Sequence, residues 1–334
     1  MAGLTGAGPR ETQTAALSPE KFHCLLEELP LHLIPRHSRD RCSPDANERR
    51  LFLNPECMLT SGGRIPAELK SNLDSLRDFE LQETIAWVRA PETRALYPFW
   101  LGPCLQQFCA QMRPGEPAPE SLDSRSGSLL NAAGILIGEA YLDRRRSMWS
   151  VIVKKRAALF RGRNYAPISD LIHPFHIAAL RRYYRQRIRR GTICLGDQQS
   201  SRRYALHNEN VARFFHVQLT KAIGDIVGEP VKPSYVYLAS YLPGAELKKH
   251  VDREQCEFSV TLCLDFSPEP ELATSWPICV DTPEGQTRVY QALGDGLVYR
   301  GTRVPHYRTA LADGYMSTSI FFHYVPERFS GTLD

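Results

Sequence analysis

The spacing of apolar residues changes at Pro233, and this change constrains the fold more than any other feature of the sequence. Before it, apolar residues recur every three or four positions, whereas after it they alternate with polar residues or form short β-branched and aromatic runs. The pattern predicts strands over residues 235–241, 258–266, 278–280, 287–292, 296–299 and 315–325. Several short strands at such intervals, separated by turns rich in Pro, Gly and Asp, indicate a barrel or a double-sheet jelly roll. Because the helices come first and the strands later, we expect an α+β protein.

Two amphipathic helices are predicted directly before these strands. The first begins at His173-Pro174 and ends at Gly191, and its apolar stripe runs from Ile177 to Ile188. The second has Asn208 as its N-cap and ends at Gly228. We expect both helices to pack on a sheet.

Positive charge is concentrated between Arg144 and Arg203, although the formal charge of the chain is only +4. Its densest part is the first of these helices, between Arg181 and Arg190, where the arginines fall mainly between the apolar positions. We therefore expect a solvated basic side on this helix. Such a side permits binding to nucleic acid, phosphate or an acidic protein.

The first 160 residues indicate a fold class and contain no catalytic motif. Apolar spacing predicts helices over residues 76–88 and 100–112, separated from later elements by Pro and Gly breaks. A length of 334 residues suggests about two domains, at roughly 150 residues each. We expect a disordered tail at 1–18, a mainly helical region of unknown role at 19–160, and a catalytic domain at 161–334.

Composition excludes several classes of protein. The chain has 43% hydrophobic and 23% charged residues, and no apolar run approaches the roughly 20 residues needed to cross a bilayer. Its N-terminus also lacks the pattern of a secretory signal, so we expect a cytoplasmic protein with no membrane partner. Nine cysteines without any Cys-x-x-Cys pair argue against both a disulfide framework and a thiolate zinc site.

A candidate metal site combines two histidines and one carboxylate from the strand-rich half. His250 and Asp252 are two residues apart after a predicted strand and turn, and alternate residues of a strand share a face. His306 follows 54 residues after Asp252, just beyond another predicted strand. Two imidazoles and a carboxylate on one face of Fe(II) leave its other positions open to a bidentate co-substrate and O2. We therefore expect His250, Asp252 and His306 to be both the metal ligands and the catalytic centre.

Residues 165–325 resemble an Fe(II)/2-oxoglutarate-dependent oxygenase, most closely the prolyl 4-hydroxylase-like branch. The resemblance lies in Tyr241-x-Pro-Gly before His250-x-Asp252, and in a Gly294-Asp295 turn before the strand that precedes His306. It implies a double-stranded β-helix barrel of the jelly-roll or cupin-like kind with supporting helices. The implied cofactors are Fe(II), 2-oxoglutarate as co-substrate, and ascorbate as a candidate reductant.

The resemblance also implies the reaction. O2 and 2-oxoglutarate would be consumed, succinate and CO2 formed, and an unactivated C–H bond hydroxylated in an amino acid, a peptide or another small molecule. Because Asp252 is present, the halogenating variants of the family are not expected, whereas desaturation and cyclisation stay open.

One departure from the family concerns the co-substrate. These enzymes usually place a Lys about ten residues after the distal His, where this chain has Met316, and no Lys follows Asp252. An Arg must then hold the far carboxylate of 2-oxoglutarate, and Arg308, two residues after His306, is the expected one. Hydroxyl donors are expected from Tyr235, Tyr241 and Ser317.

Two alternative functions stay open at this point. A catalytically silent barrel would act as a binding module, as the missing Lys suggests. A nucleic-acid-directed oxygenase or binder would use the basic helix between Arg181 and Arg190, with affinity that falls steeply as salt is added. The sequence indicates neither the substrate nor the oligomeric state.

Overall fold

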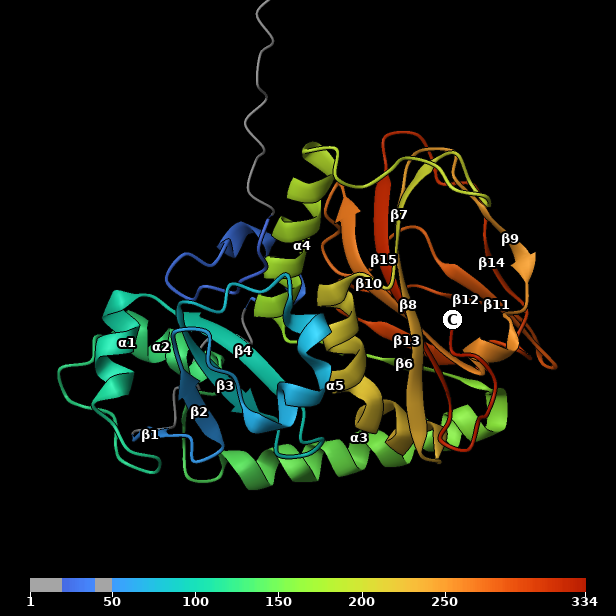
Figure 1. Ribbon diagram of the computed structural model, residues 1–334. Coiled ribbons are helices and arrows are strands. Elements are labelled where there is room, and N and C mark those ends of the chain that lie inside the picture. The colour runs from blue at the N-terminus through green and yellow to red at the C-terminus, as the bar shows by residue number, and fades with distance from the viewer. Residues whose placement is uncertain (1–19, 40–49) are drawn as a thin grey trace, which may run out of the picture.

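A computed structural model describes residues 20–39 and 50–334, so the predicted tail at 1–18 lies outside the described residues. Figure 1 shows a half with small sheets and helices beside a half built from two larger sheets, with two helices between them. The helices are α1 (Pro103–Ala110), α2 (Ser124–Ala132), α3 (Tyr141–Arg163), α4 (Pro174–Arg189) and α5 (Asn210–Val227). Short 3-10 segments are η1 (Leu31–Leu33), η2 (Arg36–Ser38), η4 (Ala67–Leu76) and η5 (Glu254–Cys256).

The C-terminal half contains two antiparallel sheets. The six-stranded sheet has the order β6 (Tyr165–Ile168), β13 (Gly296–Tyr299), β10 (Phe258–Ser267), β15 (Met316–Pro326), β8 (Val231–Tyr241) and β7 (Arg203–His207). The four-stranded sheet has the order β12 (Gly285–Val289), β11 (Ile278–Thr282), β14 (His306–Arg308) and β9 (Leu247–His250). All six predicted strands coincide with observed strands or overlap them, which confirms a mixed fold of helices and antiparallel sheets. A closed double-stranded β-helix barrel stays a prediction.

The six-stranded sheet is buried on both faces, because alternate residues of its strands face different partners. On the outer face, residues such as Val260, Leu262 and Phe322 join the large core that also contains α4 and α5. On the inner face, Leu297 and Tyr299 of β13 pack with Ile278 and Val280 of β11. The two sheets therefore face each other and enclose an interior space that is separate from the helical layer.

The N-terminal half departs from the prediction of a mainly helical region. A three-stranded sheet joins β2 (Cys57–Thr60), β3 (Thr84–Arg89) and β4 (Leu96–Leu101), while β1 (Phe52–Leu53) pairs with β5 (Leu136–Ile137). The helix predicted over 76–88 was wrong, because the run from Thr84 to Arg89 is β-branched and aromatic and lies at the centre of this sheet. The helix predicted over 100–112 is confirmed as α1, which is shorter at both ends.

Both helices predicted before the strands are present. Pro174 opens α4 at its first turn, and the His173 side chain accepts a hydrogen bond from the Phe175 amide. Helix α5 ends at Gly228 in the left-handed conformation as predicted, but its N-cap is Glu209, whose carboxylate accepts from the Ala212 amide. The predicted cap, Asn208, lies one residue earlier at φ 50°.

The prediction of a solvated basic side on α4 was wrong for Arg181, which is buried. Arg181 is 1% exposed and pairs with Asp265 and Glu269, each at 2.9 Å. Arg185 also pairs with Asp265, and Arg187 pairs with Glu209. These acidic partners neutralise much of the helix, so the nucleic-acid alternative loses the observation that motivated it.

Helix α3 runs along the lower edge of the molecule beneath both halves (Figure 1). Its inner side is fixed by buried Phe160 and by Trp149, whose indole N–H donates to Asp225 of α5 at 3.2 Å. The helix crosses the boundary predicted between residues 160 and 161, which stays a prediction. Among the described residues, no helix is both long and apolar enough to span a membrane.

Candidate metal centre

The pairing of β9 with β14 brings the two predicted histidine ligands together. His250 is the register partner of His306, and their ring centroids are 4.3 Å apart. Asp252 follows β9, and its amide donates to the Gly301 carbonyl at 2.8 Å, which holds the carboxylate beside the histidines. One potential ligand atom from each of the three residues lies within 4.8 Å of the others.

The hydrogen bonds of the two imidazoles leave the correct nitrogens free. His250 Nδ1 donates to the Lys248 carbonyl at 2.7 Å, and His306 Nδ1 donates to the Val304 carbonyl at 3.0 Å. Because a carbonyl only accepts, each proton is on Nδ1 and each Nε2 carries a lone pair. The two Nε2 atoms lie 3.6 and 3.5 Å from the same oxygen, Asp252 Oδ1. Ligand atoms at right angles around a divalent ion, each about 2.1 Å from it, would be roughly 3 Å apart, so this donor set fits one metal ion.

The pKa shifts of Asp252 and His306 favour the unprotonated forms of both side chains, which can bind a cation. Burial alone would raise the pKa of Asp252, but its hydrogen bonds and the neighbouring histidines outweigh this effect and bring the pKa to about 2. Burial lowers the pKa of His306, which keeps that imidazole neutral and able to coordinate. Asp252 raises the pKa of His250, so any proton on its Nε2 has to leave when a metal ion binds.

The second oxygen of Asp252 is held by a contact that sequence reasoning missed. Ser259 Oγ donates to Asp252 Oδ2 at 2.6 Å and is itself 2.9 Å from His323 Nδ1. Since the serine proton goes to the carboxylate, His323 must donate its Nδ1 proton to the serine oxygen. Ser259 and His323 are register partners on β10 and β15, so their meeting became visible only once those strands were paired.

A second group of potential ligands, Asp252, Cys256 and His323, overlaps the first. Burial raises the pKa of the Cys256 thiol to about 12, so its sulfur is not an available thiolate. His323 Nδ1 is already engaged by Ser259. This group therefore supports Asp252 and does not form a second metal site.

The predicted co-substrate residue Arg308 is buried in the same interior space. It lies two residues beyond His306 on β14 and is 4% exposed, while the intervening Tyr307 is half-buried. Its guanidinium donates to the Trp276 carbonyl at 2.9 Å, reaches Gln291 Oε1 at 3.5 Å, and stacks 4.5 Å above the Trp276 ring. Within 20–39 and 50–334, no carboxylate forms an ion pair with Arg308, and burial lowers its pKa.

Small side chains lie on the inner face near this arginine. Ala239, Ser319 and Cys263 are consecutive register partners across β8, β15 and β10, and Cys263 lies within electrostatic range of Arg308. Ser319 Oγ is buried and has no hydrogen-bond partner among the described residues. An unpartnered hydroxyl and a buried cation on the same inner face suit an anionic ligand that supplies acceptor oxygens.

The other predicted co-substrate residues are divided between two places. Tyr241 is fully buried near Arg308, with its ring 5.2 Å from that of Trp276, and Ser317 is its register partner. Tyr235 lies on the Asp252 side instead, where its hydroxyl is 3.1 Å from Cys256 Sγ. The roles predicted for these three residues stay predictions.

The three potential ligands differ in their exposure to solvent. The side chain of His250 is 36% exposed, whereas those of Asp252 and His306 are 12% and 3% exposed. A reacting molecule therefore approaches past His250, with Arg308 buried deeper on the neighbouring strand.

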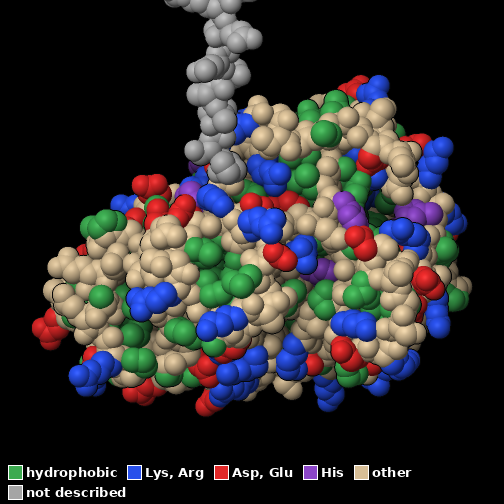
Figure 2. Space-filling view, viewed as in Figure 1, with side chains coloured by type: hydrophobic (Ala, Val, Ile, Leu, Met, Phe, Trp, Pro, Cys, Tyr) green, Lys and Arg blue, Asp and Glu red, His purple; other side chains and the backbone are tan. Residues whose placement is uncertain are grey.

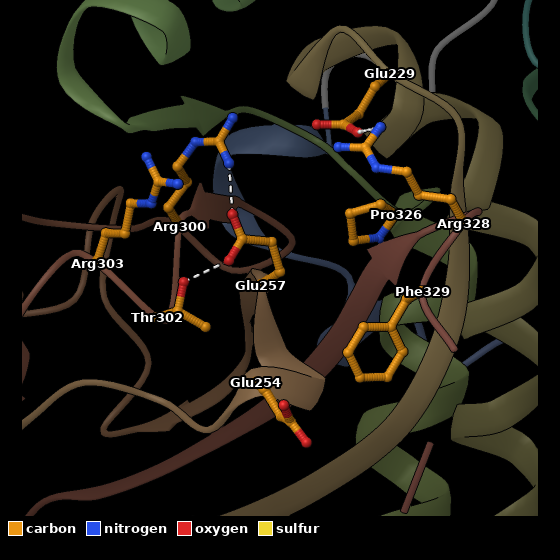
Figure 3. Close-up of a pocket in the computed structure, with 9 residues that line it drawn as sticks. All are labelled: Glu229, Glu254, Glu257, Arg300, Thr302, Arg303, Pro326, Arg328 and Phe329. Carbon is orange, nitrogen blue, oxygen red and sulfur yellow. Dashed lines mark hydrogen bonds and ion pairs between the residues drawn. The ribbon is translucent and has the colours of Figure 1, made fainter. Parts of the chain in front are cut away.

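A pocket of about 450 Å³ lies elsewhere and is lined by none of the three predicted metal ligands. As Figure 3 shows, Glu257 bonds Arg300 and Thr302, each at 2.5 Å, and Glu229 pairs with Arg328. These mutual contacts satisfy most of its charge, so the pocket is not the candidate site.

No protein-family model and no curated protein sequence matches the chain. Among solved structures, it is similar to the non-heme α-ketoglutarate-dependent epimerase SnoN from nogalamycin biosynthesis, at 10% identity and a TM-score of 0.45 over 53% of this chain and 84% of that one. It is also similar to a Pseudomonas putida prolyl-4-hydroxylase, at 14% identity and 0.41 over 51% and 98%. A third is a 2OG-Fe(II) oxygenase family oxidoreductase from Burkholderia pseudomallei, at 16% and 0.42 over 54% and 92%. At such identities the function has to be argued from this chain's own side chains.

Proposed function

We propose that the protein is an Fe(II)- and 2-oxoglutarate-dependent dioxygenase that hydroxylates an unactivated C–H bond of an amino acid, a peptide or another small molecule. One observation carries the proposal. The lone pairs of His250, Asp252 and His306 converge on one point, and the strand that supplies His306 also supplies a buried guanidinium that has no carboxylate partner in the described part of the chain.

The metal triad would bind Fe(II), and Arg308 would bind a carboxylate of the co-substrate. When bound, Fe(II) and 2-oxoglutarate supply an oxidant from O2, with succinate and CO2 as the co-products. His250, Asp252 and His306 would hold the metal on one side and leave its remaining positions free for ligands.

Arg308 would bind the far carboxylate of 2-oxoglutarate. The guanidinium presents paired N–H donors that match a carboxylate, and stacking on Trp276 and the bond to the Trp276 carbonyl fix its plane. Its burial makes this pairing stronger than in water, because the surrounding medium screens charge poorly. Ser319 would donate its free hydroxyl to the same ligand.

Anaerobic titration of the apo-protein with Fe(II) and 2-oxoglutarate tests this function. We expect a weak visible charge-transfer band that needs both components, disappears in His250→Ala, and weakens in Arg308→Ala. His207→Ala is the matched control, because the His207 side chain is 43% exposed and pairs with Asp334, away from the three potential metal ligands.

The contrary outcomes separate the alternatives. Metal binding without any effect of 2-oxoglutarate would favour the catalytically silent binding module. Succinate production that survives His250→Ala would sink the assignment altogether.

A further inference from the structure

Helix α3 carries a charge that the proposed chemistry does not use. Its sequence contains eight Lys or Arg residues and one Asp, a net charge of +7, whereas the whole chain has a formal charge of +4. The rest of the protein is therefore net negative, at −3. Figure 2 shows Lys and Arg side chains gathered along the lower edge of the molecule, where α3 runs in Figure 1.

Part of this charge is not neutralised by the protein itself. Arg145 pairs with Glu92, Arg146 with Asp143, and Arg163 with Glu284. Among the described residues, by contrast, no carboxylate forms an ion pair with the cations in the C-terminal half of the helix before Arg163, which are Lys154, Lys155, Arg156 and Arg161.

The outer side of α3 is also apolar at its centre. Met148, Val151 and Ile152 are 57%, 54% and 36% exposed, and these three of the twelve exposed large hydrophobic residues described lie within five positions. Met148, Val151 and Lys155 are three and four residues apart, so they share one face of the helix. Trp149 and Phe160 occupy the opposite face, which packs on the protein.

We propose that the outer face of α3 is a docking surface for an anionic lipid bilayer. A helix of 23 residues is about 34 Å long, and one lying in the bilayer surface places apolar side chains at the acyl boundary and its cations among the headgroups. The prediction of no membrane partner rested on the lack of a spanning segment, which contact of this kind does not need.

The observations favour a lipid surface over two other occupants. A second copy of the chain would set the cations of one α3 face against those of another in a symmetric dimer, and like charges would repel. Nucleic acid would use the cations alone and would leave Met148, Val151 and Ile152 exposed to water or to phosphate, whereas a bilayer buries them.

Vesicle co-sedimentation of the full chain tests the proposal. We expect binding to phosphatidylcholine vesicles that contain phosphatidylserine, little binding to phosphatidylcholine alone, and weakening with salt. Neutralising Lys154 and Lys155 together by Gln should lower partitioning roughly 25-fold, at about fivefold for each cation. Val151→Asp should lower it about tenfold or more, since the lost apolar burial is that of a whole valine side chain.

Matched control variants come from η4, a segment outside α3. Lys70→Gln removes an exposed cation and Leu73→Asp alters a side chain that is 58% exposed, and both should bind vesicles like the wild type. Circular dichroism would establish that every variant is folded.

Three results would overturn the proposal. The first is no binding to the anionic vesicles. The second is binding that persists in Val151→Asp. The third is a duplex RNA probe bound more tightly than the vesicles and equally by Val151→Asp, which would make α3 a site for polyanions.

Discussion

Two buried arginines, Arg181 on the outer face of the six-stranded sheet and Arg308 on its inner face, have opposite electrostatic environments. On the outer face, Arg181 of α4 is neutralised by Asp265 and Glu269, and its third contact is the Leu33 carbonyl. On the inner face, Arg308 is equally buried, and its contacts among the described residues are the Trp276 carbonyl, a long contact to Gln291 and the face of an indole. Arg203, the third buried arginine described, lies over the Tyr241 ring on this inner face as well, but like Arg181 it has a counter-ion, Asp197 at 2.7 Å.

This difference distinguishes structural charge from functional charge. A buried cation without a counter-ion is costly to the folded state, so folding alone gives no reason to keep one. Arg181 has its counter-ions within the chain, whereas Arg308 would obtain a counter-ion from a bound ligand. The metal triad lies on the same inner side, so this ligand would have to contact both Arg308 and the metal ion.

The largest expected effect on stability is at the outer arginine. Arg181→Leu leaves Asp265 and Glu269 buried without their partner, and we expect a loss of about 3–5 kcal/mol in the free energy of unfolding. Denaturant titration measures it, with Arg189→Leu on the exposed side of the same helix as the control. A loss below about 1 kcal/mol, within the range of surface substitutions, would remove the contrast between the two arginines.

Replacing the inner arginine, Arg308, should not destabilise the protein, in contrast to replacing Arg181. In Arg308→Met we expect the apo-protein to be as stable as the wild type or more so, because a buried unpaired charge is replaced by an apolar side chain of similar length. Its affinity for 2-oxoglutarate should fall at least about 30-fold, as expected for a truncated buried charge pair. Calorimetry on the Fe(II)-loaded protein measures this affinity, and unchanged binding would reject Arg308 as the anchor.

The buried histidines should also make the stability of the protein depend on pH. Burial lowers the pKa values of the outer histidines His173, His176 and His216 to about 4, 3 and 3. Their unfolded pKa is about 6.5, so their contribution is complete above that pH and is lost as pH falls toward 4, at roughly 2 kcal/mol for each histidine at pH 5. The contribution of His250 has the other sign, because the neighbouring Asp252 carboxylate favours the protonated imidazole and raises its pKa.

Thermal denaturation of the apo-protein between pH 7 and pH 5 measures this dependence. His176→Gln should flatten the curve. An unchanged slope in that variant would show that the buried imidazoles are not its source.

The smallest expected effect concerns the contact behind the metal carboxylate. Ser259→Ala frees Asp252 Oδ2, and we expect metal affinity to fall about tenfold, as for other groups that orient a ligand. Ser259→Thr should restore it, and Ser240→Ala, a buried serine on the opposite face of the sheet, should not change it. Titration of the apo-protein with Co(II) reports affinity without turnover, and equal losses in the two alanine variants would make the contact merely structural.

Local patterns in the sequence were sufficient for the long elements of the C-terminal half. Strand β10 alternates apolar with small polar residues, β8 and β15 contain β-branched and aromatic runs, and α4 and α5 each have an apolar stripe, so their positions were predicted to within a few residues. Strand β14 has only three residues, too short for periodicity to be recognised, although it supplies both His306 and Arg308. Helix α3 was missed because its sequence is basic on nearly every side and has little apolar periodicity.

At the candidate site, contacts between residues far apart in the sequence could not be predicted unless metal chemistry restricted the choice of residues. The His-x-Asp spacing and the distal histidine suggested the triad, because metal chemistry restricts which residue types can share an ion. The burial of Arg181 could not be inferred, since Asp265 is 84 positions away and its strand had not been placed against α4. Ser259 and His323 meet across a strand pair for the same reason, at a separation of 64 residues.

The spacing of His306 and Arg308 on β14 fixes the separation of the two groups that would bind the ends of a diacid. Alternate residues of a strand are about 6.6 Å apart, so the distance from the metal ligand to the guanidinium is built into the backbone and does not depend on a flexible loop. A diacid bound at both points would be selected by its chain length. On this basis, we expect the affinity for 2-oxo diacids to depend on the number of carbons between their ends, so the protein would discriminate among metabolites that carry the same charges.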